Sequence, residues 1–131
     1  MVRNLRMVYV GWIGIIVVAI VLQFYLAGYG VFGFHGVTDF GAHFLVGDLI
    51  GLAILVGVGL AFAARMPWRV TIINIALFVL MFVQALLAHT GIQALSALHV
   101  VNGVLIFVGT FYLVREATKV VWPGSRLARP M

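Results

Sequence analysis

The residues of this sequence best suited to chemistry are its four histidines, His35, His43, His89 and His99. An imidazole can ligate a metal, exchange a proton or hold a hydrogen bond near neutral pH. The sequence contains no cysteine, which excludes disulfides, thiolate metal sites and cysteine nucleophiles. Any bound metal must therefore be held by histidine, carboxylate or thioether groups.

The histidines belong to a strongly apolar chain of 131 residues, of which 65% are hydrophobic and 8% are charged. Soluble domains carry roughly 25% charged residues, so the composition and a mean hydropathy of +1.23 predict an integral membrane protein. An isoelectric point of about 10.5 would suggest a nucleic-acid partner in a soluble protein. Here the basic residues flank apolar runs, so we expect contact with membrane lipids and no nucleic acid.

Four segments are apolar over the roughly 20 residues that a spanning helix needs. They cover residues 7–27, 40–64, 70–88 and 95–114. The first run lacks a small-x-small cleavage site and is interpreted as a retained helix. The sequence therefore predicts an all-α fold, an integral membrane four-helix up-and-down bundle in which residues 1–131 form a single domain. Residues 115–131 are expected to form a short cytoplasmic tail, amphipathic or irregular.

The basic residues give this bundle an orientation, because all of them fall on one side of the four predicted spans. By the positive-inside rule that side is cytoplasmic. We therefore expect a multi-pass protein of the prokaryotic cytoplasmic (inner) membrane with both termini inside and all four histidines in its outer half. The basic residues are Arg3, Arg6, Arg65, Arg69, Arg115, Lys119, Arg126 and Arg129.

His43 and His99 begin the second and fourth predicted spans, which run in the same direction and are diagonal neighbours in a simple bundle. Each is followed four residues later by a glycine, Gly47 or Gly103, which leaves space for a flat macrocycle on the same helix face. At helical spacing both faces continue with residues that predict an inward orientation, which are Gly51, Ile54 and Val58 after His43 and Asn102, Ile106 and Thr110 after His99. Two neutral imidazoles on facing helices can ligate haem iron. The pattern therefore predicts a haem b site with His43 and His99 as ligands and Gly47 and Gly103 beside the ring.

Other interpretations of the histidines stay open. At about 1.5 Å per residue, His99 lies roughly 24 Å above Arg115 and His43 roughly 33 Å above Arg65, so their depths differ. The same count places Asp48 near His99, and a hydrogen bond between them is an alternative to iron ligation. The pair could also be packing residues bonded to carbonyls or amides. His35 and His89 are favoured as interfacial residues, with weaker claims as metal ligands, propionate partners or quinone contacts.

The histidine segments AHFLVG and LSALHVVNG resemble one four-helix half of haem A synthase, and more generally bis-histidine membrane cytochrome b bundles. The resemblance implies haem b near the outer face with His43 and His99 as iron ligands. It does not imply the synthase reaction, because no glutamate lies in the outer half where the haem would be. The only glutamate, Glu116, lies at the cytoplasmic end of the fourth span. The sequence also lacks the second four-helix half of that family.

These observations predict an electron-transfer protein with a bis-histidine haem near the outer leaflet. Its partners would be quinol or a larger respiratory or redox membrane complex, and a homo-oligomer is compatible with the pattern. The alternative is a cofactor-free accessory or structural subunit of a larger membrane complex. The sequence has no phosphate loop, nucleophile elbow or paired catalytic acids, so a redox subunit is favoured over an autonomous enzyme.

Overall fold

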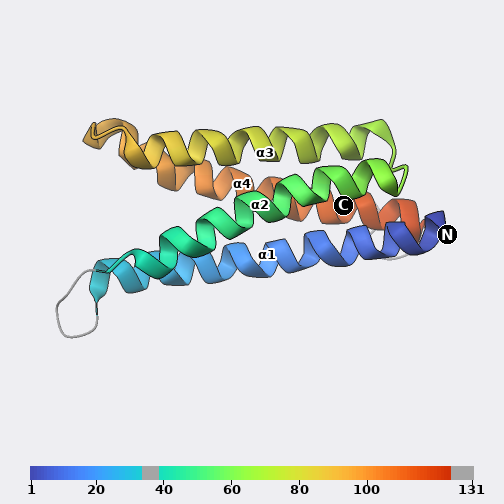
Figure 1. Cartoon of the computed structure of the whole chain (residues 1–131), viewed down its shortest axis with the longest axis horizontal. Helices are drawn as coiled ribbons and strands as arrows, with labels where there is room; N and C mark the ends of the chain where they lie inside the picture. The colour runs from blue at the N-terminus through green and yellow to red at the C-terminus, as the bar shows by residue number, and fades with distance from the viewer. Residues whose placement is uncertain (34–38, 125–131) are drawn as a thin grey trace.

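The computed structural model describes residues 1–33 and 39–124, and this part of the chain folds into four helices. All four are long and apolar enough to cross a membrane. The predicted all-α architecture of four span-length helices is therefore confirmed. The helices are α1 (Val2–Phe32), α2 (Gly41–Ala63), α3 (Trp68–His89) and α4 (Gln93–Val121), as drawn in Figure 1.

The helix ends differ from the sequence-based bounds most clearly at α4, which continues past the expected end at Val114 to Val121. The helix therefore includes residues 115–121, which the sequence-based bounds assigned to the tail. Hydropathy falls where the charged residues begin, but the helix goes on because Glu116, Ala117 and Thr118 remain buried against the bundle. His35, Arg126 and Arg129 lie outside the described residues.

The helices form an antiparallel ring in which each packs against its neighbours in the chain and α1 packs against α4. Within the described residues, α2 has no close backbone approach to α4, and α1 has none to α3. The histidine-bearing helices α2 and α4 are therefore diagonal, as expected. The space along the axis is filled mainly by buried aliphatic side chains, among them Ile13, Ile16, Ile54, Leu77, Ile106 and Leu113.

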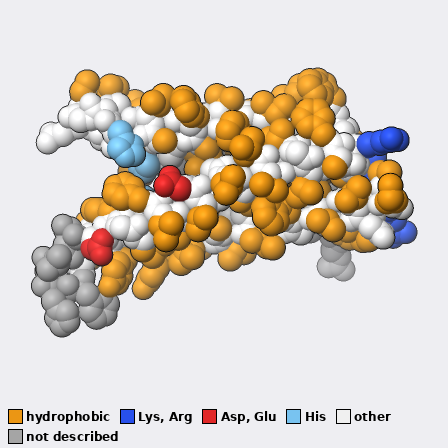
Figure 2. Space-filling model, in the orientation of Figure 1, with side chains coloured by type: hydrophobic (Ala, Val, Ile, Leu, Met, Phe, Trp, Pro, Cys, Tyr) orange, Lys and Arg blue, Asp and Glu red, His pale blue; other side chains and the backbone are white. Residues whose placement is uncertain are grey.

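The two ends of the bundle differ in chemistry (Figure 2). The basic end carries the described arginine and lysine residues, Arg3, Arg6, Arg65, Arg69, Arg115 and Lys119. There Arg6 donates from Nε to Ala64 O at 3.2 Å and from Nη2 to Arg65 O at 2.9 Å, which satisfies carbonyls at the end of α2. Buried Glu116 accepts a hydrogen bond from Lys119 and lies beside Arg69.

The opposite end, called here the histidine end, carries His43, His89 and His99. The turn from α3 to α4 is short there, because Gly91 adopts a positive φ of 68° that L side chains rarely tolerate. Figure 1 shows the α1–α2 pair diverging from the α3–α4 pair toward this end. The fold therefore leaves interior space where the histidines are.

Candidate cofactor site between the two helical hairpins

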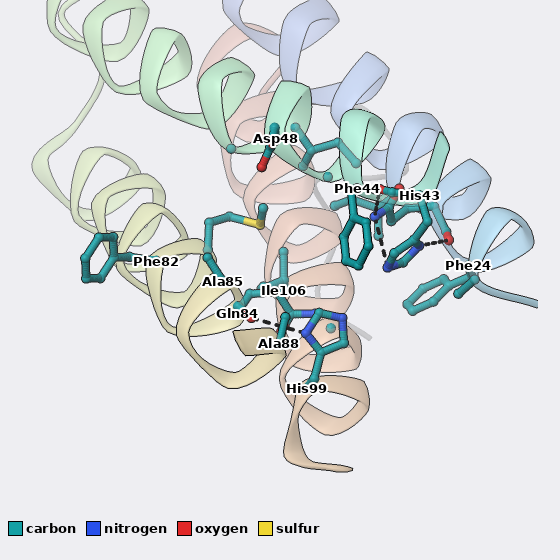
Figure 3. A pocket seen from close by; sticks show the side chains of 18 of the residues that line it. Phe24, His43, Phe44, Asp48, Phe82, Gln84, Ala85, Ala88, His99 and Ile106 are labelled. Carbon is teal, nitrogen blue, oxygen red and sulfur yellow. Dashed lines mark hydrogen bonds between the residues drawn. The ribbon is translucent and has the colours of Figure 1, made fainter. Parts of the chain in front are cut away.

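A cavity of about 360 Å³ lies at the histidine end and is lined by residues of all four helices (Figure 3). Its volume falls within the roughly 300–1,000 Å³ typical of small-molecule sites. Most of its wall is apolar, with Phe24, Phe78, Met81 and Ile106 among the lining residues. Its polar side chains are Gln23, His43, Asp48, Gln84, His89 and His99.

The structure brings His43 and His99 together across this cavity, although their helices are diagonal. The centroids of the two imidazole rings lie 6.1 Å apart, and the ring planes meet at 61°. Residue counting gave the two histidines different depths along the bundle, and the oblique course of α2 relative to α1 accommodates this difference (Figure 1). Two residues from distant parts of the chain thus form one pair of nitrogen donors.

Each histidine is oriented by a backbone carbonyl of the helix that precedes it. His43 Nδ1 lies 3.3 Å from Gln23 O, and His99 Nδ1 lies 3.1 Å from Gln84 O. A carbonyl oxygen only accepts hydrogen bonds, so these contacts require hydrogen on Nδ1 and leave a lone pair on Nε2. The same second-sphere contact fixes the tautomer of metal-ligating histidines. Both rings are therefore prepared to donate through Nε2.

The side chains of the same two glutamines reach toward the Nε2 atoms. Gln23 Nε2 lies 3.4 Å from His43 Nε2, and Gln84 Nε2 lies 3.2 Å from His99 Nε2. These amide groups also take the space beside the glycines. A Cβ added at Gly47 would lie 3.0 Å from Gln23 Nε2, and one at Gly103 would lie 3.3 Å from Gln84 Nε2. The space assigned from sequence to a macrocycle is thus filled by amides here.

The site is built twice, once in each helical hairpin. The α1–α2 hairpin contributes Gln23, His43 and Gly47, and the α3–α4 hairpin contributes Gln84, His99 and Gly103. From residue type alone, the glutamines are interpreted as ordinary interhelical hydrogen-bonding groups. The repeat is hard to see in the sequence because the glutamine precedes its histidine by 20 residues in one hairpin and 15 in the other.

The two glutamine side chains are held by different hydrogen bonds: Gln23 Nε2 donates to His43 O at 2.8 Å, whereas the Gln84 amide is held through its oxygen. Asn102 Nδ2 donates to Gln84 Oε1 at 2.7 Å and to Leu80 O at 2.9 Å. By contrast, Gln23 Oε1 is buried and has no hydrogen-bond donor within the described residues. The predicted inward orientation of Asn102, Ile106 and Thr110 is confirmed, since all three are buried.

Asp48 lines the cavity, but the hydrogen bond to His99 considered from sequence is not formed. Both ring nitrogens of His99 face Gln84. His89 lines the same cavity, where its Nδ1 donates to Ala85 O at 2.8 Å and its ring lies 6.3 Å from that of Phe44. Among the described residues, no three or more histidine, cysteine or acidic side chains group as a metal site. The two imidazoles whose rings approach each other across the cavity, His43 and His99, therefore form a pair without a third ligand of these types among the described residues.

Fold and site together define a small four-helix bundle with span-length apolar helices and a histidine pair between its two hairpins. The chain belongs to DUF6220, a family of unknown function, which matches residues 23–91. The matched region includes Gln23, His43, Asp48 and Gln84, and ends before His99. No curated protein and no solved structure matches this chain.

Proposed function

We propose that this protein spans a prokaryotic cytoplasmic membrane four times, with its basic end inside and its histidine end near the outer leaflet. The apolar length of the four helices supports insertion. The collection of the described basic residues at one end supports the orientation, because cytoplasmic flanks are enriched in lysine and arginine. The first residue of α1 and the last residue of α4 lie at that end, so both termini are cytoplasmic in this proposal.

We further propose that the histidine pair binds one haem b, for electron transfer near the outer leaflet. The observation that carries this proposal is the pairing of His43 with His99, each with Nδ1 directed at a backbone carbonyl. Metal–imidazole bonds of roughly 2 Å place two ring centres about 6 Å apart across one ion. The ring centroids here are separated by 6.1 Å.

The residues around the pair suit this group. Two neutral imidazoles are a common axial set for haem iron, which supplies reversible one-electron chemistry. The carbonyls of Gln23 and Gln84 hold the rings in place, and the apolar wall excludes water from them. The glutamine amides must rotate away from the Nε2 atoms before iron can be held there. Buried Gln23 Oε1, which lacks a donor among the described residues, favours such a rearrangement in the first hairpin.

The resemblance to haem A synthase supports the same ligand pair, but we do not propose the synthase reaction. Glu116 is the only glutamate in the sequence and lies near Lys119 and Arg69 at the basic end. The proposed class is a small redox subunit of the cytochrome b type. Its electron partners would be quinol or a larger membrane complex, and self-association is compatible with its exposed apolar faces.

A second candidate is a cofactor-free accessory subunit of a larger membrane complex. It is favoured by the amide of each glutamine, which already offers a hydrogen bond to the lone pair on the neighbouring Nε2. In this case the Gln23–His43 and Gln84–His99 contacts would join neighbouring helices as interhelical hydrogen bonds do in membranes. The histidines would then be structural.

A reduced-minus-oxidised absorption spectrum of the purified chain separates the two candidates. Expression with sufficient haem supply is expected to give b-type bands at one haem per chain. Reconstitution of the purified chain with haem provides a second route to the same complex. A folded protein that shows no b-type signal by either route would contradict the haem proposal and support the accessory subunit.

A further inference from the structure

The cavity has a lateral mouth between α2 and α3. Its lining includes Phe44 and Leu52 of α2 and Phe82 of α3, and the exposed fractions of these residues are 53%, 58% and 65%. Figure 2 shows the hollow on the face formed by these helices, with histidine and acidic side chains visible in it. In the proposed membrane orientation the mouth faces acyl chains, so a ligand would enter from the bilayer.

Asp48 is the polar residue that most needs a partner at this mouth. Its side chain projects from α2 toward the cavity (Figure 3). No hydrogen bond or ion pair to its carboxylate is formed by the described residues, and the side chain is exposed. A carboxylate inside an apolar span is costly, by roughly 2.5–3.5 kcal/mol at the centre of a helix. A ligand that supplies a hydrogen-bond donor would lower this cost.

The lining also restricts the charge of the ligand. No arginine or lysine is present among the cavity residues, so an anionic phosphate would meet Asp48 without a balancing cation. The rest of the cavity lining is mostly apolar and aromatic, with Phe44, Phe78, Met81 and Leu52 among its residues. Such a wall, with a few polar groups, fits a neutral, flat headgroup that carries hydroxyls.

We propose that this mouth binds the headgroup of a membrane-borne quinol, with the Asp48 carboxylate accepting a hydrogen bond from one quinol hydroxyl. The Phe44 ring and the Met81 side chain, whose Cε lies 3.7 Å from a Cβ built at Gly51 of α2, form the apolar walls. His89, which contacts Phe44, lies at the rim. The choice of a redox-active headgroup rests on the proposed electron-transfer function. The binding itself needs no haem, so the two ideas can fail separately.

A photoreactive azido-quinone tests the site directly in protein reconstituted into lipid nanodiscs. We expect labelling on peptides of α2 and α3 around the mouth, displaced by excess unlabelled quinol. Loss of a hydrogen bond to a charged group costs about 1.5–3 kcal/mol, so Asp48→Leu should weaken quinol competition roughly tenfold or more. Asp48→Asn keeps an acceptor and should have a smaller effect. Leu52→Trp should block the mouth without removing the carboxylate.

Asp39→Asn is the matched control, because Asp39 accepts a hydrogen bond from Gly41 N at 2.8 Å and does not line the cavity. Its labelling should equal that of the parent chain. Retention of helical circular dichroism and a monodisperse elution profile identifies variants that are folded. Equal labelling and competition in folded Asp48→Leu, Leu52→Trp and parent protein would overturn the proposal.

Two further outcomes distinguish this inference from the proposed function. Labelling that depends on Asp48 in a chain unable to bind haem would uphold the quinol site and contradict the cytochrome. A b-type spectrum without Asp48-dependent labelling would do the reverse. Displacement of the probe by a cationic amphiphile but not by quinol would overturn the assignment of the ligand class.

Discussion

Gln84 faces both ring nitrogens of His99, with its backbone oxygen 3.1 Å from Nδ1 and its side-chain nitrogen 3.2 Å from Nε2. Gln23 has the same relationship with His43, but it lacks the additional hydrogen bond from Asn102 that fixes the Gln84 amide. Gln23 Nε2 instead donates to His43 O at 2.8 Å. The two halves of the site are therefore alike in geometry and unequal in the hydrogen bonds made by their glutamine oxygens.

This inequality predicts different costs for two matched substitutions. Gln84→Leu removes the acceptor of buried Asn102. Gln23→Leu removes the hydrogen bond to His43 O, but it also removes an oxygen that is buried without a donor among the described residues, which offsets part of the loss. We expect Gln84→Leu to lower the free energy of unfolding by about 0.5–1.5 kcal/mol more than Gln23→Leu. Unfolding in mixed detergent and sodium dodecyl sulfate micelles measures both. An equal or larger loss for Gln23→Leu would show that the Asn102 contact adds no stability.

Substitution of each histidine assigns the proposed iron ligands. His43→Ala and His99→Ala should each abolish the b-type spectrum or reduce it at least tenfold, because each removes one of the two Nε2 donors. His89→Ala should retain the spectrum, since the Nδ1 of His89 is bonded to Ala85 O and its ring contacts Phe44. If His89→Ala alone removed the spectrum, a different ligand set would be required.

Close packing at Gly57 of α2 gives a test of how α2 packs against its neighbouring helices. A Cβ at this position would lie 3.0 Å from Asn74 Nδ2 and 3.2 Å from Ile13 Cδ1, and both neighbours are almost fully buried. Overpacking of this kind costs about 1–3 kcal/mol, so the free energy of unfolding of Gly57→Ala should lie below that of Gly59→Ala by about this amount, since both substitutions gain the same helix propensity. Gly59→Ala, on the same helix with nothing within 4 Å, is the control. Comparable free energies of unfolding of the two variants would contradict the close packing of α2 against α1 and α3.

The absence of cysteine from the sequence makes the proposed topology easy to test with single-cysteine variants. Thr90→Cys lies at the histidine end and Gly124→Cys lies beyond the end of α4, and both positions are exposed. A membrane-impermeant maleimide should label Thr90→Cys in intact spheroplasts and Gly124→Cys only after permeabilisation. The opposite pattern would invert the orientation, and equal labelling of both without permeabilisation would contradict a crossing of the membrane by α4.

The four-helix fold could be predicted from the sequence because hydropathy alone defines spans of this length. The juxtaposition of His43 and His99 could also be anticipated, since parallel helices in an up-and-down bundle are diagonal. The end of α4 could not, because Glu116 is stabilised by Lys119 and the nearby Arg69 rather than by hydropathy. Charged residues therefore marked the end of the apolar window and not the end of the helix.

The glutamines of the site were anticipated only in general terms, because bonds of the histidine pair to carbonyls or amides were an alternative drawn from the sequence, without the pairing of each histidine with one glutamine. Gln23 and Gln84 act partly through backbone carbonyls, which every residue has, so residue type gives no signal for that contact. Their side chains meet Gly47 and Gly103 only because the hairpins place those positions opposite one another. Asp48, by contrast, stands out in the sequence as an unusual acid in an apolar span. The structure adds that a hydrogen bond from Asp48 to His99, which the sequence left open as an alternative, is not formed, because His99 contacts Gln84.

Because the Gln–His–Gly unit occurs once in each hairpin, the short link from α2 to α3 joins two pieces that each contain one complete unit. Each piece keeps its histidine together with the glutamine that orients it, so severing the chain at this link would divide the donor pair evenly between fragments. Separately produced fragments would need only their facing surfaces to re-create the pair. By the same logic, a homodimer of one such fragment could hold an equivalent site about a two-fold axis, with one histidine from each copy.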